Sequence, residues 1–286
     1  MFANSFRTIH PAAGATGLRT FEFQHDSLYD PSVPRTSEDF LINSRLVRAD
    51  LEFGLSVGTY FREGGSILEG LVGVNSESVL ALPGPTDLPM RLTSAIERRR
   101  SSRAYTGDPM RLDQLSAILW ASAGTTKAGS KGCSNSGPRT TASAGALYPV
   151  TFWIVALNIK GLERAVYAYD PIQHSLVVMA HAEAVSAVLG SIATPDEMIM
   201  ISRACLVGFF VARPWRSMRK YGARGMRHVF IEAGAMAAHC HLACAALGFG
   251  SVDCSSVYDD ELHEALGVDG LHEGLTHTVV VGSIDA

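Results

Sequence analysis

The 286-residue sequence lacks the patterns of several common protein classes. Its 5 cysteines form no CxxC pair, which argues against a zinc knuckle and a disulfide framework. Its net charge of -4 excludes the global basic field that would hold a nucleic-acid backbone, so we expect no nucleic-acid partner. It has neither a GxGxxG fingerprint nor a GxxxxGK[ST] loop, which argues against the two common nucleotide-binding folds.

Secretion and membrane signals are also missing. The opening "MFANSFRTIHPAAGATG" has no uninterrupted apolar core, and no apolar run approaches the roughly 20 residues that a membrane helix needs. We therefore predict a cytoplasmic protein without a membrane partner. The one candidate metal cluster, "HCHLAC" at 239–244, lies in a long Ala-rich predicted helix where His and Cys usually fill the core, so we predict no metal.

The composition, 47% hydrophobic and 18% charged, suits one large globular domain or a domain with a substantial extension. Residues 1–90 are rich in turn-forming and chain-stiffening stretches around one regular segment at 38–61, and they are predicted to form an N-terminal extension. From residue 91 onward the pattern becomes orderly. We predict that residues 91–286 form the main domain.

The main domain mixes helical and strand patterns without a strict βαβ alternation. Helices are predicted at 91–100, 112–124, 228–250 and 259–267, and strands at 151–158, 165–170, 175–180, 205–213 and 276–283. The run "CLVGFFVAR" has the continuous apolar character of a central strand buried on both faces. This order predicts an α+β fold around a mixed or antiparallel sheet flanked by helices.

An arginine-rich segment, "RRRSSRAY" at 98–105, is the first candidate site. If the helix continues through it, Arg99 and Arg103 share one face and Ser101 adds a hydroxyl nearby. Guanidinium groups bind phosphate oxygens in a bidentate manner, so the segment is a candidate phosphate site. A solvated cationic face is the alternative.

The second candidate site is "RTTASAGALYP" at 139–149, which ends a long polar loop. The small residues Ser143, Ala144 and Gly145 allow backbone N–H groups to approach a flat ligand closely. An ordinary tight turn is the alternative.

The third candidate site is Lys220 and Tyr221 within "WRSMRKYGARGMRH". Adjacent side chains diverge on a regular helix or strand, so these two converge only on an irregular segment, which Gly222 makes plausible. The surrounding arginines disfavour a protonated amine, which suits Lys220 to act as a general base. A solvated basic turn that contacts an anion is the alternative.

Five segments taken in order resemble the SagB-type azoline dehydrogenases, the thiazole- and oxazole-forming branch of the FMN-dependent nitroreductase family. The resemblance covers the chain from Met90 onward. Its segments are "RRRSSRAYTGDPMRLDQLSAILWASAG", "RTTASAGALYP", "GLERAVYAYDPIQHSL", "RKYGARGMRHVFIEAG" and "AALGFGS".

The resemblance implies a nitroreductase-like homodimer with FMN at the subunit interface. By motif position it implies that Lys220 and Tyr221 deprotonate the azoline substrate. It implies cofactor-binding roles for Arg99, Arg100, Ser101, Arg103, Ser143, Ala144, Gly145, Gly248 and Gly250. The implied substrate is an azoline-containing peptide, and the implied partner enzymes are a cyclodehydratase or a peptide synthetase.

Three functional hypotheses follow. The first is an FMN-dependent dehydrogenase that oxidises thiazoline or oxazoline rings in a peptide during natural-product biosynthesis. The second is a general FMN and NAD(P)H nitroreductase, since one fold supports many hydride-transfer reactions. The third is a non-catalytic docking subunit that keeps flavin only as structure.

Overall fold

The computed structural model describes residues 36–46, 51–62, 79–126 and 138–285. These residues divide into two compact units. The first contains α3 (Thr36–Asn43) and α4 (Leu51–Arg62) together with Met218–Arg227. The second contains the sheet and the other described residues. The regular segment expected in the extension therefore consists of two helices.

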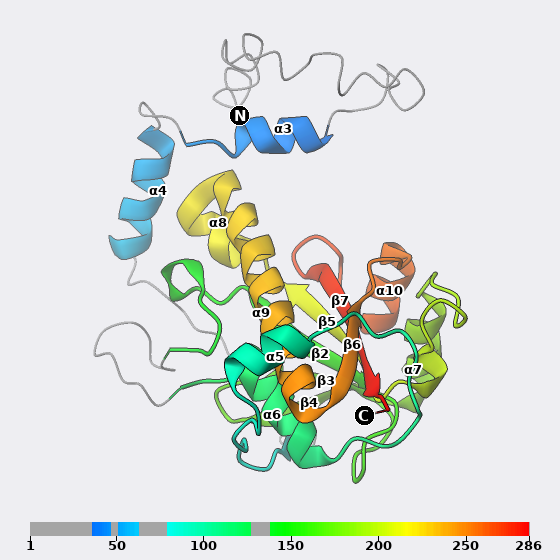
Figure 1. Ribbon diagram of the computed structural model, residues 1–286. Helices are drawn as coiled ribbons and strands as arrows, with labels where there is room; N and C mark the ends of the chain where they lie inside the picture. Colours follow the sequence, from blue (N-terminus) through cyan, green and yellow to red (C-terminus); the bar gives the residue numbers. More distant parts are fainter. Residues whose placement is uncertain (1–35, 47–50, 63–78, 127–137, 286) are drawn as a thin grey trace, which may run out of the picture. The chain divides into compact units, whose positions relative to one another are not determined.

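The second unit is built on a seven-stranded sheet with the order β1-β4-β3-β2-β5-β7-β6 (Figure 1). Every ladder between these strands is antiparallel, which confirms the predicted α+β class with an antiparallel sheet. The strands are β1 (Val79–Ala81), β2 (Val150–Ala156), β3 (Val166–Asp170), β4 (Ser175–Ala180), β5 (Leu206–Ala212), β6 (Phe249–Asp253) and β7 (Gly274–Ser283).

Helices flank this sheet close to the positions expected from the sequence, and Gly124 ends one of them as predicted. The helices of the second unit are α5 (Leu92–Arg98), α6 (Leu112–Ala123), α7 (Ala182–Gly190) and α10 (Asp259–Leu266). Two further helices, α8 (Trp215–Tyr221) and α9 (Gly225–Leu247), are shared between the units, because Met218–Arg227 belongs to the first. Short 3-10 turns lie at Ala144–Ala146, Ile201–Arg203 and Gly222–Arg224.

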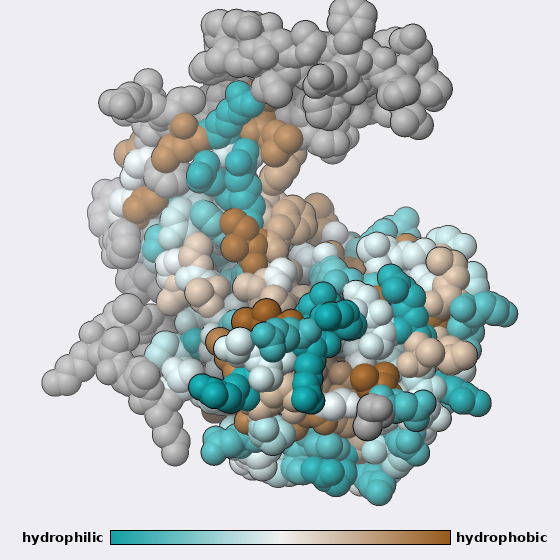
Figure 2. Space-filling view, viewed as in Figure 1, coloured by the Kyte–Doolittle hydropathy of each residue, from teal (hydrophilic) through white to brown (hydrophobic). Residues whose placement is uncertain are grey.

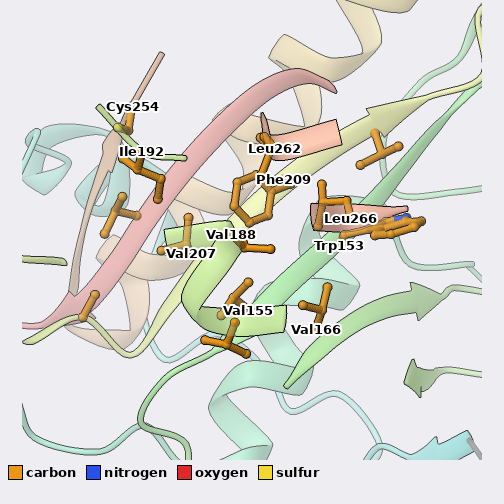
Figure 3. Close-up of a cluster of buried hydrophobic side chains, with 14 of the residues drawn as sticks. Trp153, Val155, Val166, Val188, Ile192, Val207, Phe209, Cys254, Leu262 and Leu266 are labelled. Atoms are coloured by element: carbon orange, nitrogen blue, oxygen red, sulfur yellow. The ribbon is translucent and has the colours of Figure 1, made fainter. Parts of the chain in front are cut away.

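The central strand β5 is buried along its whole length, as its apolar run predicts. Alternate side chains of the central strands supply two cores. On one face, Figure 3 shows Trp153 beside Leu266 and Phe209 beside Leu262, so α10 packs on the sheet there. On the other face Phe152 and Phe210 stack with ring centroids 4.5 Å apart.

Three elements of the second unit were not anticipated. Strand β6 begins at Phe249, inside the helix expected at 228–250, because α9 ends at Leu247. Helix α7 packs on β3 and β4 beside α10 and buries Val185 and Val188. Strand β1 pairs with β4 at the edge of the sheet, with Leu80 opposite Leu176. The segment expected as an extension, residues 1–90, therefore includes an edge strand of the main sheet.

The stretch Trp215–Leu247, which joins α8 to α9, has 33 residues and is long and apolar enough to cross a membrane by length and composition. The sequence was expected to contain no apolar run of membrane-spanning length, but the mean hydropathy of this stretch reaches 1.4. Of its most apolar window, 56% is buried within the protein. Gly222 also interrupts the stretch with φ +55. A core helix of a soluble protein has these features, so the stretch is weak support for a membrane span.

Candidate functional site

A cavity of about 480 Å³ lies where α5, the end of α9 and β6 meet. This volume is within the range of about 300–1,000 Å³ that is usual for small-molecule sites. The arginine-rich segment and Gly248, which were both expected to hold a cofactor, thus meet at one cavity, while Gly250 is not among its lining residues. Its lining residues are Arg98, Arg99, Arg100, Ser102, His241, Ala245, Gly248, Phe249, Ser251, Ile284 and Asp285.

The arginine-rich segment is extended, not helical. Helix α5 ends at Arg98, and Arg99 has an extended backbone with φ -53 and ψ 122. The prediction that Arg99 and Arg103 share a helical face is therefore wrong. The backbone continues along β6, where Ser102 N–H donates to Ser251 O at 3.1 Å. Pairing with the sheet thus replaces the helix.

The individual side chains of this segment differ in environment. Arg99 is half-buried and lines the cavity. The Arg100 guanidinium lines the cavity too, while it donates to the backbone oxygens of Glu97 and Arg99 at 2.7 and 2.8 Å. Ser101 and Arg103 are exposed and do not line the cavity. Among these residues, Arg99 is the most available for an anionic ligand.

Gly250 permits the close approach of the arginine-rich segment to β6. A Cβ at this position would lie 2.6 Å from Ser102 Cβ and 2.5 Å from Ile284 Cγ2. Its cofactor-binding role stays a prediction, whereas its packing role follows from these distances. Gly248 has φ +80 at the end of α9, where a side chain would be strained.

We expect Gly250→Ala to lower the free energy of unfolding by about 1–3 kcal/mol, because the new methyl group overpacks this junction. Gly234→Ala is the matched control, since a Cβ there meets nothing within 4 Å inside α9. In a helix that change stabilises by up to about 1 kcal/mol. Urea unfolding measures the free energy of unfolding of both variants. Equal unfolding midpoints for Gly250→Ala and Gly234→Ala would contradict the packing role of Gly250.

His241 lies in the wall of the cavity and was not identified from the sequence as a site residue. Its Nδ1 lies 2.7 Å from Ser251 Oγ, and its Nε2 lies 2.8 Å from Asp253 Oδ1. His277 Nε2 bonds the same carboxylate oxygen at 2.7 Å. These two hydrogen bonds hold the pKa of the Asp253 carboxyl well below its usual range. The hydrogen bond to Asp253 and the contact with Ser251 together fix the orientation of the His241 imidazole.

The "HCHLAC" cluster agrees with the core interpretation. Cys240, His241 and Cys244 are buried on α9. Among the described residues, no group of three or more His, Cys, Asp or Glu side chains could hold a metal ion.

The Ser143–Gly145 turn precedes β2 and has an unusual backbone. Gly145, Ala146 and Tyr148 have φ values of 64, 54 and 46. Non-glycine residues in this region each cost of order 1–3 kcal/mol, so neighbouring contacts must hold them. Ser143 Oγ accepts from Tyr148 N–H at 2.9 Å, and Arg216 Nη1 donates to Tyr148 O at 3.2 Å. These two hydrogen bonds hold Tyr148, at the end of this backbone segment, to Ser143 and to Arg216.

A buried carboxyl group, Glu232 on α9, lies behind this turn. It is 3% exposed, and its Oε1 accepts from Val150 N–H at 3.3 Å. Its Oε2 has no hydrogen-bond partner among the described residues. Burial raises the Glu232 pKa to about 7, although Ser143, Val150, Arg139 and Arg216 oppose the rise. This proton-binding group was missed because "HVFIEAG" shows only one Glu in a helical pattern.

Lys220 and Tyr221 belong to the first unit, at the end of α8. Tyr221 leaves the helical conformation with φ -114 and ψ 9, and Gly222 follows with φ +55. The helix is therefore broken where the sequence predicted. Lys220 is 6% exposed, and its Nζ lies 5.2 Å from the centroid of the Tyr221 ring. The adjacent side chains approach each other, while their chemical role stays a prediction.

Comparisons with known proteins agree with this fold. The model of the nitroreductase family matches residues 96–283. A protein named as a nitroreductase from Methanocaldococcus jannaschii is 34% identical over 179 residues, which cover 63% of this chain and 85% of that protein. Because the family model matches more than half of the chain, the chain belongs to the nitroreductase family of oxidoreductases.

Solved structures of other proteins also resemble the chain. A protein of Ralstonia eutropha, named as a nitroreductase, has a TM-score of 0.61 and 27% identity and covers 78% of this chain and 96% of its own. A chain of the Escherichia coli microcin synthetase McbBCD complex, solved with truncated pro-MccB17 bound, has a TM-score of 0.56 and 16% identity. It covers 91% of this chain and 96% of its own, and at this identity the likeness shows the fold alone.

Proposed function

We propose that the protein is an FMN-dependent dehydrogenase that oxidises thiazoline or oxazoline rings in a peptide to thiazole or oxazole. The observation that carries the proposal is the environment of Lys220, which is 6% exposed beside the ring of Tyr221. A lysine amine in a desolvated site is suited to act as a general base. Reduction of a nitro group needs no base for a carbon acid, so this arrangement favours azoline oxidation over nitro reduction.

The residues of the arginine-lined cavity fit the cofactor. Three arginines line it, and guanidinium groups suit the phosphate of FMN. Arg99 would hold that phosphate, and the Ser143–Gly145 turn would supply backbone groups to the ring system. When bound, FMN would accept the β-hydride of the substrate, and molecular oxygen would reoxidise it.

The protein's own residues would carry the proton chemistry. Lys220 Nζ would accept the Cα proton of the azoline ring, and Tyr221 would orient or share that proton. Loss of this proton and of the β-hydride leaves a new ring double bond and an aromatic azole. The substrate thus loses two hydrogens in total.

We expect Arg99→Ala to weaken FMN binding by about 10- to 100-fold, which is the effect of losing a hydrogen bond to a charged group. Titration of the apoprotein with FMN, followed by quenching of flavin fluorescence, measures the affinity. Arg111→Ala is the control, since Arg111 is exposed and pairs with Asp113 at 2.9 Å. Undiminished FMN affinity in Arg99→Ala would contradict the phosphate site and favour the alternative, in which the arginine-rich segment is a solvated cationic face.

The partners follow from the surface and from the comparisons. Phe230 and Ile231 on α9 are 49% and 67% exposed, and Leu92 and Ile96 on α5 are 66% and 57% exposed. Figure 2 shows hydrophobic residues, in brown, on the side where Figure 1 draws these two helices. An exposed apolar surface of this kind supports a homodimer. A partner cyclodehydratase or peptide synthetase is proposed from the resemblance of the sequence segments. The fold of this chain is compatible with it, since a chain of the microcin synthetase complex has a similar fold over 91% of this chain.

The reaction itself provides the test. Incubation of the FMN-loaded protein with a thiazoline-containing peptide in air should lower the peptide mass by two hydrogens, as measured by mass spectrometry. The general nitroreductase hypothesis, favoured by the 34% identity to the Methanocaldococcus jannaschii protein, predicts no such change. The docking-subunit hypothesis predicts that the protein binds flavin but turns over neither the thiazoline peptide nor a nitro compound.

A further inference from the structure

The side-chain nitrogen of Lys220 lies close to two tyrosine rings. Its Nζ is 5.2 Å from the centroid of Tyr221 and 4.8 Å from the centroid of Tyr60. Tyr60 comes from α4, which is more than 150 residues earlier in the chain, and it is only 7% exposed. Both distances are within the range of about 6 Å in which a cation is attracted to a ring face. The N-terminal segment, which here means α3 and α4, thus supplies one of the two tyrosine rings near Lys220.

A second set of contacts attaches the N-terminal segment to the same part of the chain. Arg227 Nε donates to Ser44 Oγ at 2.8 Å, and Arg227 Nη2 donates to Leu41 O at 2.8 Å. Arg224 Nη1 lies 3.4 Å from Ser44 O. The guanidinium of Arg219 lies 5.3 Å from the centroid of Tyr60. Of the four arginines around Lys220, three therefore contact the N-terminal helices or Ser44 directly after α3, which is a role that their sequence pattern did not indicate: Arg219, Arg224 and Arg227.

We propose that Tyr60 is a positioning residue that holds the Lys220 amine against Tyr221 and shields it from water. The N-terminal segment then completes the base site, so it is a functional part of the enzyme. This inference rests on the proposed function where it concerns catalysis. The placement of Lys220 by Tyr60 is a property of the protein alone and can be measured without turnover.

Lys220 Nζ lies 4.8 Å from the centroid of the Tyr60 ring, so substitutions can test the ring and the hydroxyl separately. Tyr60→Phe keeps the ring face, whereas Tyr60→Leu keeps an apolar side chain without a π system. Leu55→Ala is a control on the same helix, since Leu55 is 63% exposed. Lys160 is exposed and serves as an internal reference for amine reactivity.

The experiment is amine acetylation of the FMN-loaded full-length protein, with peptide mass spectrometry of Lys220 and Lys160 over time. We expect Lys220 to react at least tenfold more slowly than Lys160 in the wild type, Tyr60→Phe and Leu55→Ala. We expect Tyr60→Leu to raise the Lys220 rate about tenfold and to leave the Lys160 rate unchanged. The azoline-oxidation kcat should fall in Tyr60→Leu and be restored in Tyr60→Phe.

Several results would overturn the proposal. One is a Lys220 acetylation rate in Tyr60→Leu equal to that of the wild type. Another is an equal increase in Tyr60→Phe and Tyr60→Leu, because then the ring would not provide the shielding. The expected acetylation pattern with no azoline oxidation by the wild type would support the placement of Lys220 by Tyr60 and refute the proposed function. The two failures are therefore distinguishable.

Discussion

Lys220→Ala is expected to oxidise a thiazoline peptide about 10²- to 10⁴-fold more slowly than the wild type, the usual contribution of a general base. The variant should still bind FMN, because Lys220 is not among the residues that line the arginine-lined cavity. Single-turnover kinetics with FMN-loaded protein measure the rate. Lys160→Ala, at an exposed lysine, is the control for loss of positive charge.

Lys220→Arg separates the two roles that Lys220 could have. Arginine keeps the positive charge and the attraction to the rings of Tyr60 and Tyr221, but its guanidinium stays protonated in proteins. We therefore expect Lys220→Arg to fold, bind FMN and be as inactive as Lys220→Ala. Substantial azoline oxidation by Lys220→Arg would show that charge and not proton abstraction is what the reaction needs.

The second large effect concerns Glu232 and the pH dependence of stability. Burial raises its pKa from 4.5 to about 7 in the folded protein. The unfolded chain releases this proton at lower pH than the folded chain does. The contribution of Glu232 to stability is therefore fully present below about pH 4.5 and is lost as the pH rises to about 7. The size of that loss is about 3 kcal/mol.

Glu232→Gln removes this titration while it keeps the shape of the side chain. We expect the wild type and the variant to have similar melting temperatures near pH 5. At pH 8 the variant should melt about 5–10 °C higher, since about 3 kcal/mol in a protein of this size corresponds to such a shift. Differential scanning calorimetry from pH 5 to pH 8 measures it. Glu264→Gln, at an exposed position on α10, is the control.

Parallel melting curves of the wild type and Glu232→Gln across this pH range would contradict the buried-carboxyl interpretation. A variant that melts lower at every pH would show instead that the carboxylate is needed to brace the Ser143–Gly145 turn. In that case the charge of Arg139 and Arg216 would outweigh the cost of burial.

The fold was largely predictable because its elements have strong local patterns. The continuous apolar run of β5 and the length of α9 each specify one type of element. Gly124 ends α6 as its sequence context indicates. The short strand β1 was not predictable, because three residues at a sheet edge carry no periodicity and become a strand only by pairing with β4.

The candidate site was less predictable, since its geometry depends on residues distant in the sequence. The helix expected through Arg99–Arg103 ends at Arg98 because the segment pairs with Ser251, about 150 residues later. The link between His241, Asp253 and His277 and the burial of Glu232 are likewise tertiary effects. The break after Tyr221 was predictable, because Gly222 follows it directly and takes a positive φ.

The most direct test of the proposed function is anaerobic mixing of the FMN-loaded protein with a thiazoline peptide or with NADPH in a stopped-flow spectrophotometer. We predict that the peptide bleaches the absorbance of bound FMN in a single turnover and that the peptide product is two hydrogens lighter. NADPH should bleach it much more slowly. Rapid bleaching by NADPH with none by the peptide would contradict the proposed function and favour a general nitroreductase.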